Sequence, residues 1–172
     1  MTDWDAVVGQ HVEIVQRTIH RLVGNDADAW DCIQETFIEA VKIDRREAVR
    51  NWSALLRHLA TARALDLLRK RCRQQNRHCP EADLAEAASR EPNPSSRAEA
   101  SELAERLRAA VGQLPRRQAE VFCLSYFEQM TSEEVAQRLR VSPTATRMLL
   151  CRARGRLQRL LEPLVGAPEE DS

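Results

Sequence analysis

The last third of the chain contains two helix starts close together, and this feature restricts the fold more than any other. Thr131-Ser132-Glu133-Glu134 has the pattern of a capping box, in which the Thr131 hydroxyl accepts from the backbone N–H of Glu134 and the Glu134 carboxylate reaches back. Val135 and Leu139 then follow at helical spacing. The pattern predicts a short amphipathic helix.

A second helix is expected directly after this one. Val141 is expected in the turn, Ser142 at the N-cap and Pro143 at the first helical position, where its missing N–H costs nothing. No acidic residue occurs between Pro143 and Leu160, but five arginines do: Arg147, Arg152, Arg154, Arg156 and Arg159. A short helix, a tight turn and an arginine-rich second helix fit the DNA major groove. Residues 114–160 are therefore predicted to form a DNA-binding helix-turn-helix.

Charge is strongly segregated along a chain whose formal net charge is zero. Two segments are basic, with balances of +6 at 57–77 and +7 at 138–159. Three are acidic, with −6 at 1–39, −5 at 78–105 and −4 over the last thirteen residues. This pattern predicts two nucleic-acid-binding faces and acidic surfaces available to protein partners.

The composition of the 172-residue chain favours a helical, folded protein. Apolar residues make up 43% and charged residues 30%, and only five glycines occur. No stretch approaches the roughly 18 apolar residues that a membrane span needs, and the acidic N-terminus lacks a signal-peptide pattern. We expect a cytoplasmic protein without membrane insertion.

An acidic, proline-containing segment divides the chain. Residues 79–96 hold three prolines and almost no large apolar side chain, so this segment cannot offset its ordering entropy and is expected to be a flexible linker. The expected fold is all-α, with one small helical domain at 1–77, a linker at 78–96 and a second helical domain at 97–172 that contains the helix-turn-helix.

Three helices are expected in the first domain. The first runs from about Trp4 to Val23 and ends at Gly24, where a left-handed residue is favoured. The second begins at Asn25-Asp26, and the third runs from about 51 to 75. The second helix has an apolar stripe that we expect to be buried, formed by Trp30, Ile33, Phe37, Ala40 and Val41.

The cysteines and histidines give no clear metal or catalytic site. Cys72, His78 and Cys79 could hold part of a zinc site, but no fourth ligand stands at a conventional spacing. The alternative is redox sensing, since the surrounding arginines would lower a thiol pKa. The sequence contains no pair of carboxylates beside a basic site, no phosphate-binding loop, and no Ser, His and Asp at the spacing of a catalytic triad. We therefore expect a protein that is not an enzyme and has no cofactor or metal.

Three segments resemble the sigma factors of bacterial RNA polymerase. The sequence from Asp28 to Ala40, which contains Gln34-Glu35-Thr36-Phe37, is similar to the helix by which that family binds the core polymerase. Residues 64–71 resemble the end of the same domain, and residues 114–122 resemble the start of the second conserved domain. The short two-domain form resembles the extracytoplasmic-function (group four) sigma factors.

The resemblance implies a role for each surface. The acidic face of the second helix would dock on the basic coiled coil of the polymerase β′ clamp through Asp28, Asp31, Gln34, Glu35 and Glu39. The third helix would hold the melted minus-ten strand through Arg57, His58, Arg63, Arg69, Lys70 and Arg71. The last helix would read the minus-thirty-five element through Ser142, Thr144, Arg147, Met148, Cys151 and Arg152.

The sequence departs from the family pattern at two positions. Ala62 stands where the family usually has Asn, which affects the expected base specificity at the minus-ten element. Leu149 replaces a basic residue and predicts an altered sequence preference at the minus-thirty-five element. The pocket for an unstacked base would come from the 42–50 loop.

The resemblance also implies protein partners, namely the β′ clamp and the β flap of core RNA polymerase, and an anti-sigma factor that controls the protein. The alternative function is a helix-turn-helix repressor or activator with an N-terminal dimerisation domain. That alternative explains residues 114–160 equally well, but it gives no purpose to the acidic helix at 28–40 or to the basic helix that follows.

Overall fold

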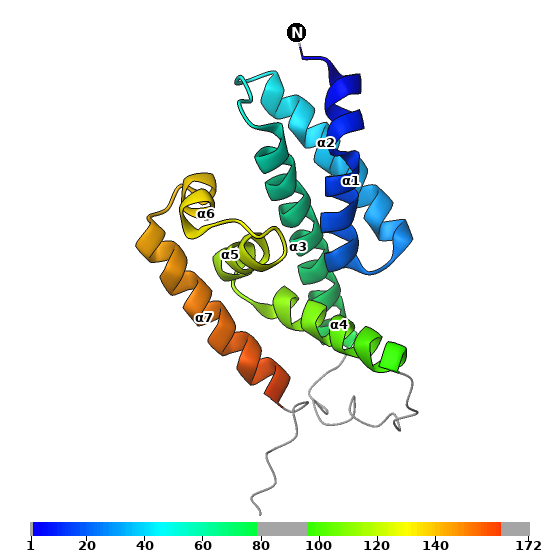
Figure 1. Ribbon diagram of the computed structural model, residues 1–172. Helices are drawn as coiled ribbons and strands as arrows, with labels where there is room; N and C mark the ends of the chain where they lie inside the picture. The colour runs from blue at the N-terminus through cyan, green and yellow to red at the C-terminus, as the bar shows by residue number, and fades with distance from the viewer. Residues whose placement is uncertain (1, 79–95, 163–172) are drawn as a thin grey trace, which may run out of the picture.

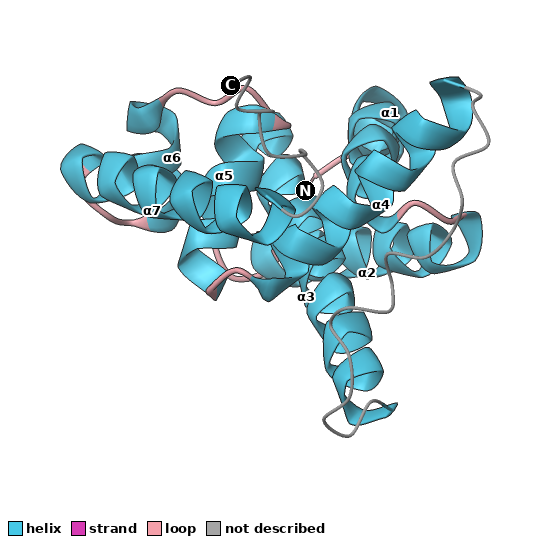
Figure 2. Ribbon diagram, turned by 90° about the horizontal axis from the view of Figure 1, so that it is seen from below, coloured by secondary structure: helices cyan, strands magenta, loops and turns pink. Residues whose placement is uncertain are grey.

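The computed structural model describes residues 2–78 and 96–162 (Figure 1). The described residues form seven helices: α1 (Trp4–Val23), α2 (Asp26–Asp44), α3 (Trp52–His78), α4 (Ser96–Gln113), α5 (Arg116–Tyr126), α6 (Ser132–Leu139) and α7 (Pro143–Leu161). No strand occurs in this part of the chain (Figure 2), and none of these helices is long and apolar enough to cross a membrane. The predicted all-α class is confirmed.

Local capping chemistry sets the ends of the first helices. Gly24 ends α1 in the left-handed region with a φ of 78°, and its N–H donates to the His20 carbonyl. The Asn25 side chain caps α2 by accepting from the backbone N–H of Asp28 at 3.0 Å. Helix α3 begins one residue later than predicted because Asn51 acts as a cap, accepting from Ala54 N–H at 2.9 Å.

The helix-turn-helix forms as the sequence predicts. Both halves of the capping box are present, since Thr131 N–H donates to the Glu134 carboxylate at 2.7 Å and Glu134 N–H donates to the Thr131 hydroxyl at 3.3 Å. Ser142 caps α7 by accepting from Ala145 N–H at 3.1 Å. Helix α6 ends at Arg140 with a left-handed φ of 55°, where the sequence offers no glycine to mark the turn.

The two helical units are packed against each other through α3, which lies between α1 and α2 on one side and α5 on the other (Figure 1). One cluster of buried side chains runs through both units and includes Ile19, Leu56, Leu65, Val111, Leu114, Ala119 and Cys123. A Cβ added to Gly112 of α4 would stand 2.9 Å from Cys72 Sγ and 3.3 Å from the Leu68 carbonyl oxygen of α3. The close approach of α4 to α3 therefore requires a glycine.

The prediction of two domains joined by a flexible linker did not include a shared core. The predicted boundaries at 1–77, 78–96 and 97–172 remain a prediction, because most of the linker, residues 79–95, lies outside the described residues. Within the described parts, however, the two units do not behave as separate bodies: their apolar faces are buried against one another.

The predicted stripe of α2 is wrong at Trp30, whose surface is 55% exposed. The buried stripe instead consists of Ile33 and four smaller side chains, Ala29, Cys32, Thr36 and Ala40. These small residues let α2 approach α1 and α3, and the Thr36 hydroxyl is satisfied by donating to the Cys32 carbonyl at 2.7 Å. Trp30 lies about 100° around the helix from Ala29 and consequently faces solvent.

Candidate functional site

The solvent face of α2 presents acidic, amide and apolar groups together. Asp31, Gln34 and Glu35 are exposed, and the side chains of Asp31 and Gln34 have no hydrogen-bond partner among the described residues. Trp30 lies beside Asp31, and Ile38, which is 54% exposed, follows Gln34 by one turn. The sequence analysis did not identify Trp30 and Ile38 as surface residues. Trp30 precedes Gln34 by four residues and Ile38 follows it by four, so the three side chains lie on the same side of the helix.

The other two predicted residues of this face, Asp28 and Glu39, form ion pairs with α3. Asp28 pairs with Arg71, and this hydrogen bond, with a second one from Asn25, lowers the pKa of the Asp28 carboxyl. Glu39 lies 3.4 Å from Arg63 and 3.4 Å from Lys42. In the centre of the predicted docking face, Glu35 also lies 3.9 Å from Arg63 but remains exposed. The centre is thus available to a partner, whereas the two flanks hold α2 on α3 by closer ion pairs.

The basic residues of α3 do not form one continuous cationic surface in this conformation, and their expected role as a minus-ten track remains a prediction. Arg63 and Arg71 face α2, and Arg71 also donates to the Val23 carbonyl at 2.8 Å. Three others are half-buried on the side of α3 that faces the second unit: Arg57, His58 and Arg69. Lys70 is exposed. The residues point to several sides because their spacing does not follow the helical repeat.

The base pocket that the 42–50 loop was expected to supply remains a prediction. The loop leaves α2 after Asp44 and reaches the start of α3 at Trp52. Ala62, the position of the departure from the family pattern, is half-buried on α3.

His58 contacts the helix-turn-helix. Its Nδ1 accepts from Arg138 Nε of α6 at 3.2 Å, which requires the imidazole to be unprotonated at that nitrogen. Burial lowers the pKa of His58, and the positive charges of Arg138, Arg117 and Arg116 act in the same direction, whereas Glu120 opposes them.

We expect acidification to weaken the folded protein through His58. A histidine whose pKa is lowered by folding binds its proton more readily in the unfolded chain, so stability is complete above the ordinary value of 6.5 and falls as the pH drops below it. The measurement is thermal unfolding between neutral and mildly acidic pH. The loss should be smaller in His58→Gln, which retains an acceptor for Arg138, and unchanged in the control His11→Gln. Equal acid sensitivity in all three proteins would contradict this role.

Helix α7 presents a polar face that is available to DNA. Thr144, Arg147, Met148, Cys151 and Arg152 are all exposed, and Ser142 is exposed at the N-cap. The opposite side is packed on α4, α5 and α6 and comprises Thr146, Ala153 and Leu157 with the half-buried Leu149 and Leu150. Leu149 therefore has a packing role, which accounts for an apolar side chain where the family usually has a basic one.

The side chains of this face have the chemistry of base and phosphate recognition. Arg147 and Arg152 can donate two hydrogen bonds to guanine or bind phosphate, and Met148 offers an apolar contact for a thymine methyl group. Arg154 is different, because its guanidinium lies 5.2 Å from the centre of the Tyr126 ring. It stabilises α7 against α5 and was not distinguished from the other arginines by the sequence.

The redox interpretation of Cys72 is wrong in its physical basis. Cys72 packs against α4 with its Sγ 3.6 Å from the Ala109 carbonyl, and burial raises the thiol pKa instead of the arginines lowering it. Cys79 and the side chain of His78 lie outside the described part of the structure. Among the residues that are described, no group of His, Cys, Asp and Glu could hold a metal ion.

Comparisons with known proteins agree in both halves of the chain. Residues 7–74 match the family model for Sigma-70 region 2, and residues 104–157 match that for Sigma-70, region 4. The chain is 32% identical over 158 residues to the ECF RNA polymerase sigma factor SigE of Mycolicibacterium smegmatis, an alignment that covers 92% of this chain and spans only 61% of that protein.

A solved structure has a similar fold. The sigma factor RpoE of Bartonella quintana, crystallised in complex with the anti-sigma factor NepR, superposes with a TM-score of 0.55. The sequences are 21% identical, and the superposition covers 94% of this chain and 98% of that one.

Proposed function

Because the chain belongs to the sigma-70 family of RNA polymerase sigma factors, we propose that it binds core RNA polymerase and directs it to promoters. The observation that carries this proposal is the separation of two exposed faces. The face of α2 is acidic and apolar and the face of α7 is basic, and the two helices lie on opposite sides of α3 in both views (Figures 1 and 2). Such a molecule can bind a protein and DNA at the same time.

The polymerase-binding role rests on the centre of the α2 face. Asp31 and Glu35 supply charge for a basic partner such as the β′ clamp, and Gln34 supplies a donor and an acceptor. Trp30 adds the type of side chain that most often dominates the binding energy of a protein interface. We propose that these four residues form the docking surface, with Asp28 and Glu39 holding α2 on α3.

The promoter-binding role rests on α7 and α3. The exposed N-terminal half of α7 has the geometry of a recognition helix, so we assign the minus-thirty-five contact to it. The minus-ten strand is assigned to the six predicted residues of α3, Arg57, His58, Arg63, Arg69, Lys70 and Arg71, of which Lys70 alone is exposed in the packed conformation. We further propose that the protein acts in the cytoplasm, that the β flap contacts the second unit, and that an anti-sigma factor controls the protein.

The alternative of an ordinary repressor or activator gains no support from the comparisons. It also leaves the exposed Trp30 and the acidic centre of α2 without a partner. Enzymatic activity is equally unsupported, because the family consists of transcription initiation factors.

Run-off transcription tests the proposed function. Purified core polymerase is incubated with the full chain on a library of genomic fragments, and transcripts are sequenced. We expect transcripts that depend on the protein and share two upstream elements. The repressor interpretation would gain instead if the protein failed to co-purify with core polymerase but bound a palindromic duplex on its own.

A further inference from the structure

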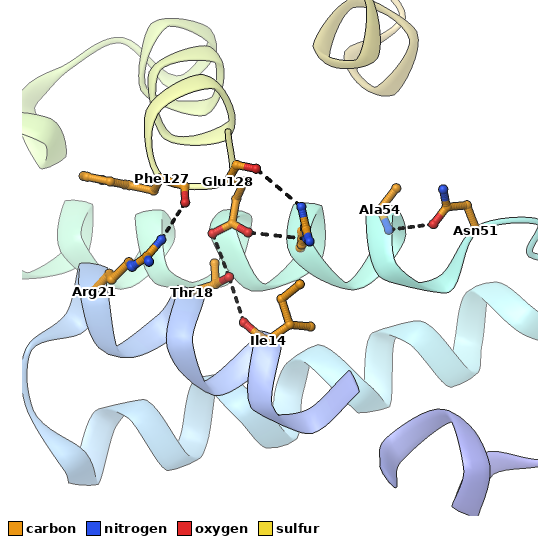
Figure 3. A network of polar contacts seen from close by, with 8 residues as sticks. Ile14, Thr18, Arg21, Asn51, Ala54, Phe127 and Glu128 are labelled. Carbon is orange, nitrogen blue, oxygen red and sulfur yellow. Dashed lines mark hydrogen bonds and ion pairs between the residues drawn. The ribbon is translucent and has the colours of Figure 1, made fainter. Parts of the chain in front are cut away.

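A polar groove lies where α1 and α3 meet the turn that follows α5. Its volume is about 510 Å³, within the range of about 300–1,000 Å³ that is typical of pockets for small ligands. One wall comes from α1, a second from α3 and a third from residues 127–129 (Figure 3). None of the residues assigned above to polymerase or to the minus-thirty-five element lines this groove. The proposed function therefore leaves most of it without a role.

Three arginines line this surface, which we call the arginine groove: Arg17 and Arg21 of α1 and Arg57 of α3. Arg17 and Arg21 are exposed and four residues apart, so they lie on the same side of α1, where like charges repel each other. Glu128 is the one acid in the lining. The arginine groove thus carries a surplus of two positive charges.

The Glu128 carboxylate belongs to the floor of the groove. Only 4% of this side chain is exposed, its Oε1 accepts from the Thr18 hydroxyl at 2.7 Å, and its Oε2 lies 3.7 Å from Arg57 Nε (Figure 3). It forms no ion pair with Arg17 or Arg21, the two arginines of α1. Their positive charge is therefore not compensated within the part of the chain that the structure describes.

Most N–H donors of the arginine groove are unused. Each guanidinium has five of them. Within the described residues, the three arginines form two hydrogen bonds, from Arg21 to the Phe127 carbonyl at 2.6 Å and from Arg57 to the Glu128 carbonyl at 3.4 Å (Figure 3). Arg57 Nε is buried without a hydrogen-bond partner there, since 3.7 Å is too long for one. Such unused donors favour an anion with several acceptor oxygens.

The turn after α5 adds neutral donors to the charged ones. Gln129 lines the groove, is exposed and has a φ of 52°, a left-handed conformation that is uncommon for a residue with a Cβ. Neither its backbone N–H nor its side-chain amide has a hydrogen-bond partner among the described residues. The groove consequently offers donors from three sides.

Donors on three sides suit a phosphate group better than a carboxylate. A phosphate monoester carries a charge of about −1.5 to −2 and three acceptor oxygens, whereas a carboxylate has two oxygens in one plane. The charge of one phosphate group also balances the surplus of the lining. The volume exceeds that of a phosphate group alone, and Ile14 and Phe127 supply an apolar part of the lining for an attached organic group.

We propose that the arginine groove binds a small phosphorylated molecule, whose phosphate oxygens accept hydrogen bonds from Arg17, Arg21 and Arg57. The organic part of the ligand lies against Ile14 and Phe127. The ligand also occupies Arg57, which is assigned to the minus-ten strand, and therefore competes with that strand. This competition rests on the proposed function, but the binding of the ligand does not.

Binding of inorganic pyrophosphate to the full chain tests the site. We expect isothermal titration calorimetry to show saturable binding of one pyrophosphate per chain. Arg17→Gln should weaken this binding at least about tenfold, because it removes a charged donor. The matched control is Arg73→Gln, which removes the same charge from an exposed position of α3 outside the groove and should leave binding unchanged.

A second variant separates bidentate recognition from charge alone. Arg17→Lys keeps the charge but lacks the planar fork, so it should give a smaller loss than Arg17→Gln. Circular dichroism checks that all variants keep their helical content. The proposal is overturned if no saturable binding occurs, if Arg17→Gln leaves it unchanged, or if Arg17→Gln and Arg73→Gln weaken it equally, since the probe would then respond only to net charge.

Three further probes test the chemistry of the ligand. Malonate, which has two carboxylates, should bind at least about tenfold more weakly than pyrophosphate. ADP should bind at least as tightly as pyrophosphate, and adenosine should not bind. Equal binding of malonate and pyrophosphate, or of adenosine and ADP, overturns the phosphate assignment. Weaker binding of ADP than of pyrophosphate overturns the place assigned to an organic group.

Competition with single-stranded DNA separates this inference from the proposed function. At constant ionic strength, saturating pyrophosphate should weaken binding of a mixed-sequence strand several-fold in the wild type and should have no effect in Arg17→Gln. If pyrophosphate binds as expected but does not displace the strand, the ligand site stands and the assignment of Arg57 to the minus-ten strand fails.

Discussion

We expect that reversing the charges of Asp31 and Glu35 to lysine will abolish co-purification of the full chain with core RNA polymerase and leave its helical content intact. Both side chains are exposed, and the nearest cation to Glu35 is Arg63 at 3.9 Å, so the fold loses only a surface ion pair of at most about 1 kcal/mol. Two lysines facing a basic partner turn attraction into repulsion. The measurement is affinity capture of core polymerase with the variant as bait.

The control for this experiment reverses two exposed acids on α1, Asp5 and Glu13, which lie outside the docking surface. It should retain polymerase. Trp30→Ala provides an independent check, because removal of an exposed aromatic changes folding stability by only about 0.5 kcal/mol, whereas loss of an interface anchor costs about 2 kcal/mol of binding. If the Asp31/Glu35 variant still captured polymerase, the assignment of α2 as the docking helix would have to be abandoned.

The helix boundaries and the helix-turn-helix were predictable because the groups that determine them are close in sequence. Asn25, Thr131 and Ser142 each cap a helix by contacting a residue three positions away, and such pairs are visible in a single sequence. The exposed face of α7 was predictable for a similar reason. Once Ser142 fixes the start of the helix, the 3.6-residue repeat assigns each later residue to one side.

The exposure of Trp30 was not predictable from periodicity. A search for large apolar residues at helical spacing centres the stripe on Trp30 and Phe37, whereas the packing of α2 is centred on Ala29, Thr36 and Ala40. Small residues contribute little to an apolar pattern, but they permit the closest approach of two helices. The functional consequence is that Trp30 becomes part of the candidate docking surface.

The packing between the two units was not predictable either, because it depends on residues far apart in the chain. The composition of residues 79–96 indicates a flexible connection, but it carries no information about whether the units on either side are in contact. In the sequence, nothing distinguishes Glu128 from an ordinary polar residue that follows a helix. Only the fold reveals that it is buried against Thr18 and Arg57 and that the predicted minus-ten residues are partly engaged in the interface.

We expect replacement of Arg147 by alanine to weaken promoter-directed binding of the holoenzyme by about 1–3 kcal/mol, roughly fivefold to 150-fold, if this side chain reads a base. Arg147 is exposed on α7 and takes part in no ion pair or side-chain hydrogen bond among the described residues, so its removal leaves the fold unaffected. Arg159→Ala is the matched control, since it removes the same charge near the far end of the same helix, where Arg159 donates to the Gly155 carbonyl.

The pattern of the loss identifies what Arg147 contacts. Binding is measured by competition with promoter duplexes that differ at single positions of the upstream element, at several salt concentrations. Relaxed preference at one position with an unchanged salt dependence indicates a base contact, because the remaining positions are still read. A uniform loss over all duplexes, with the salt slope reduced by about one, indicates a phosphate contact. No loss in either measurement would mean that α7 does not enter the groove by its N-terminal half, and the minus-thirty-five assignment would then have to be withdrawn.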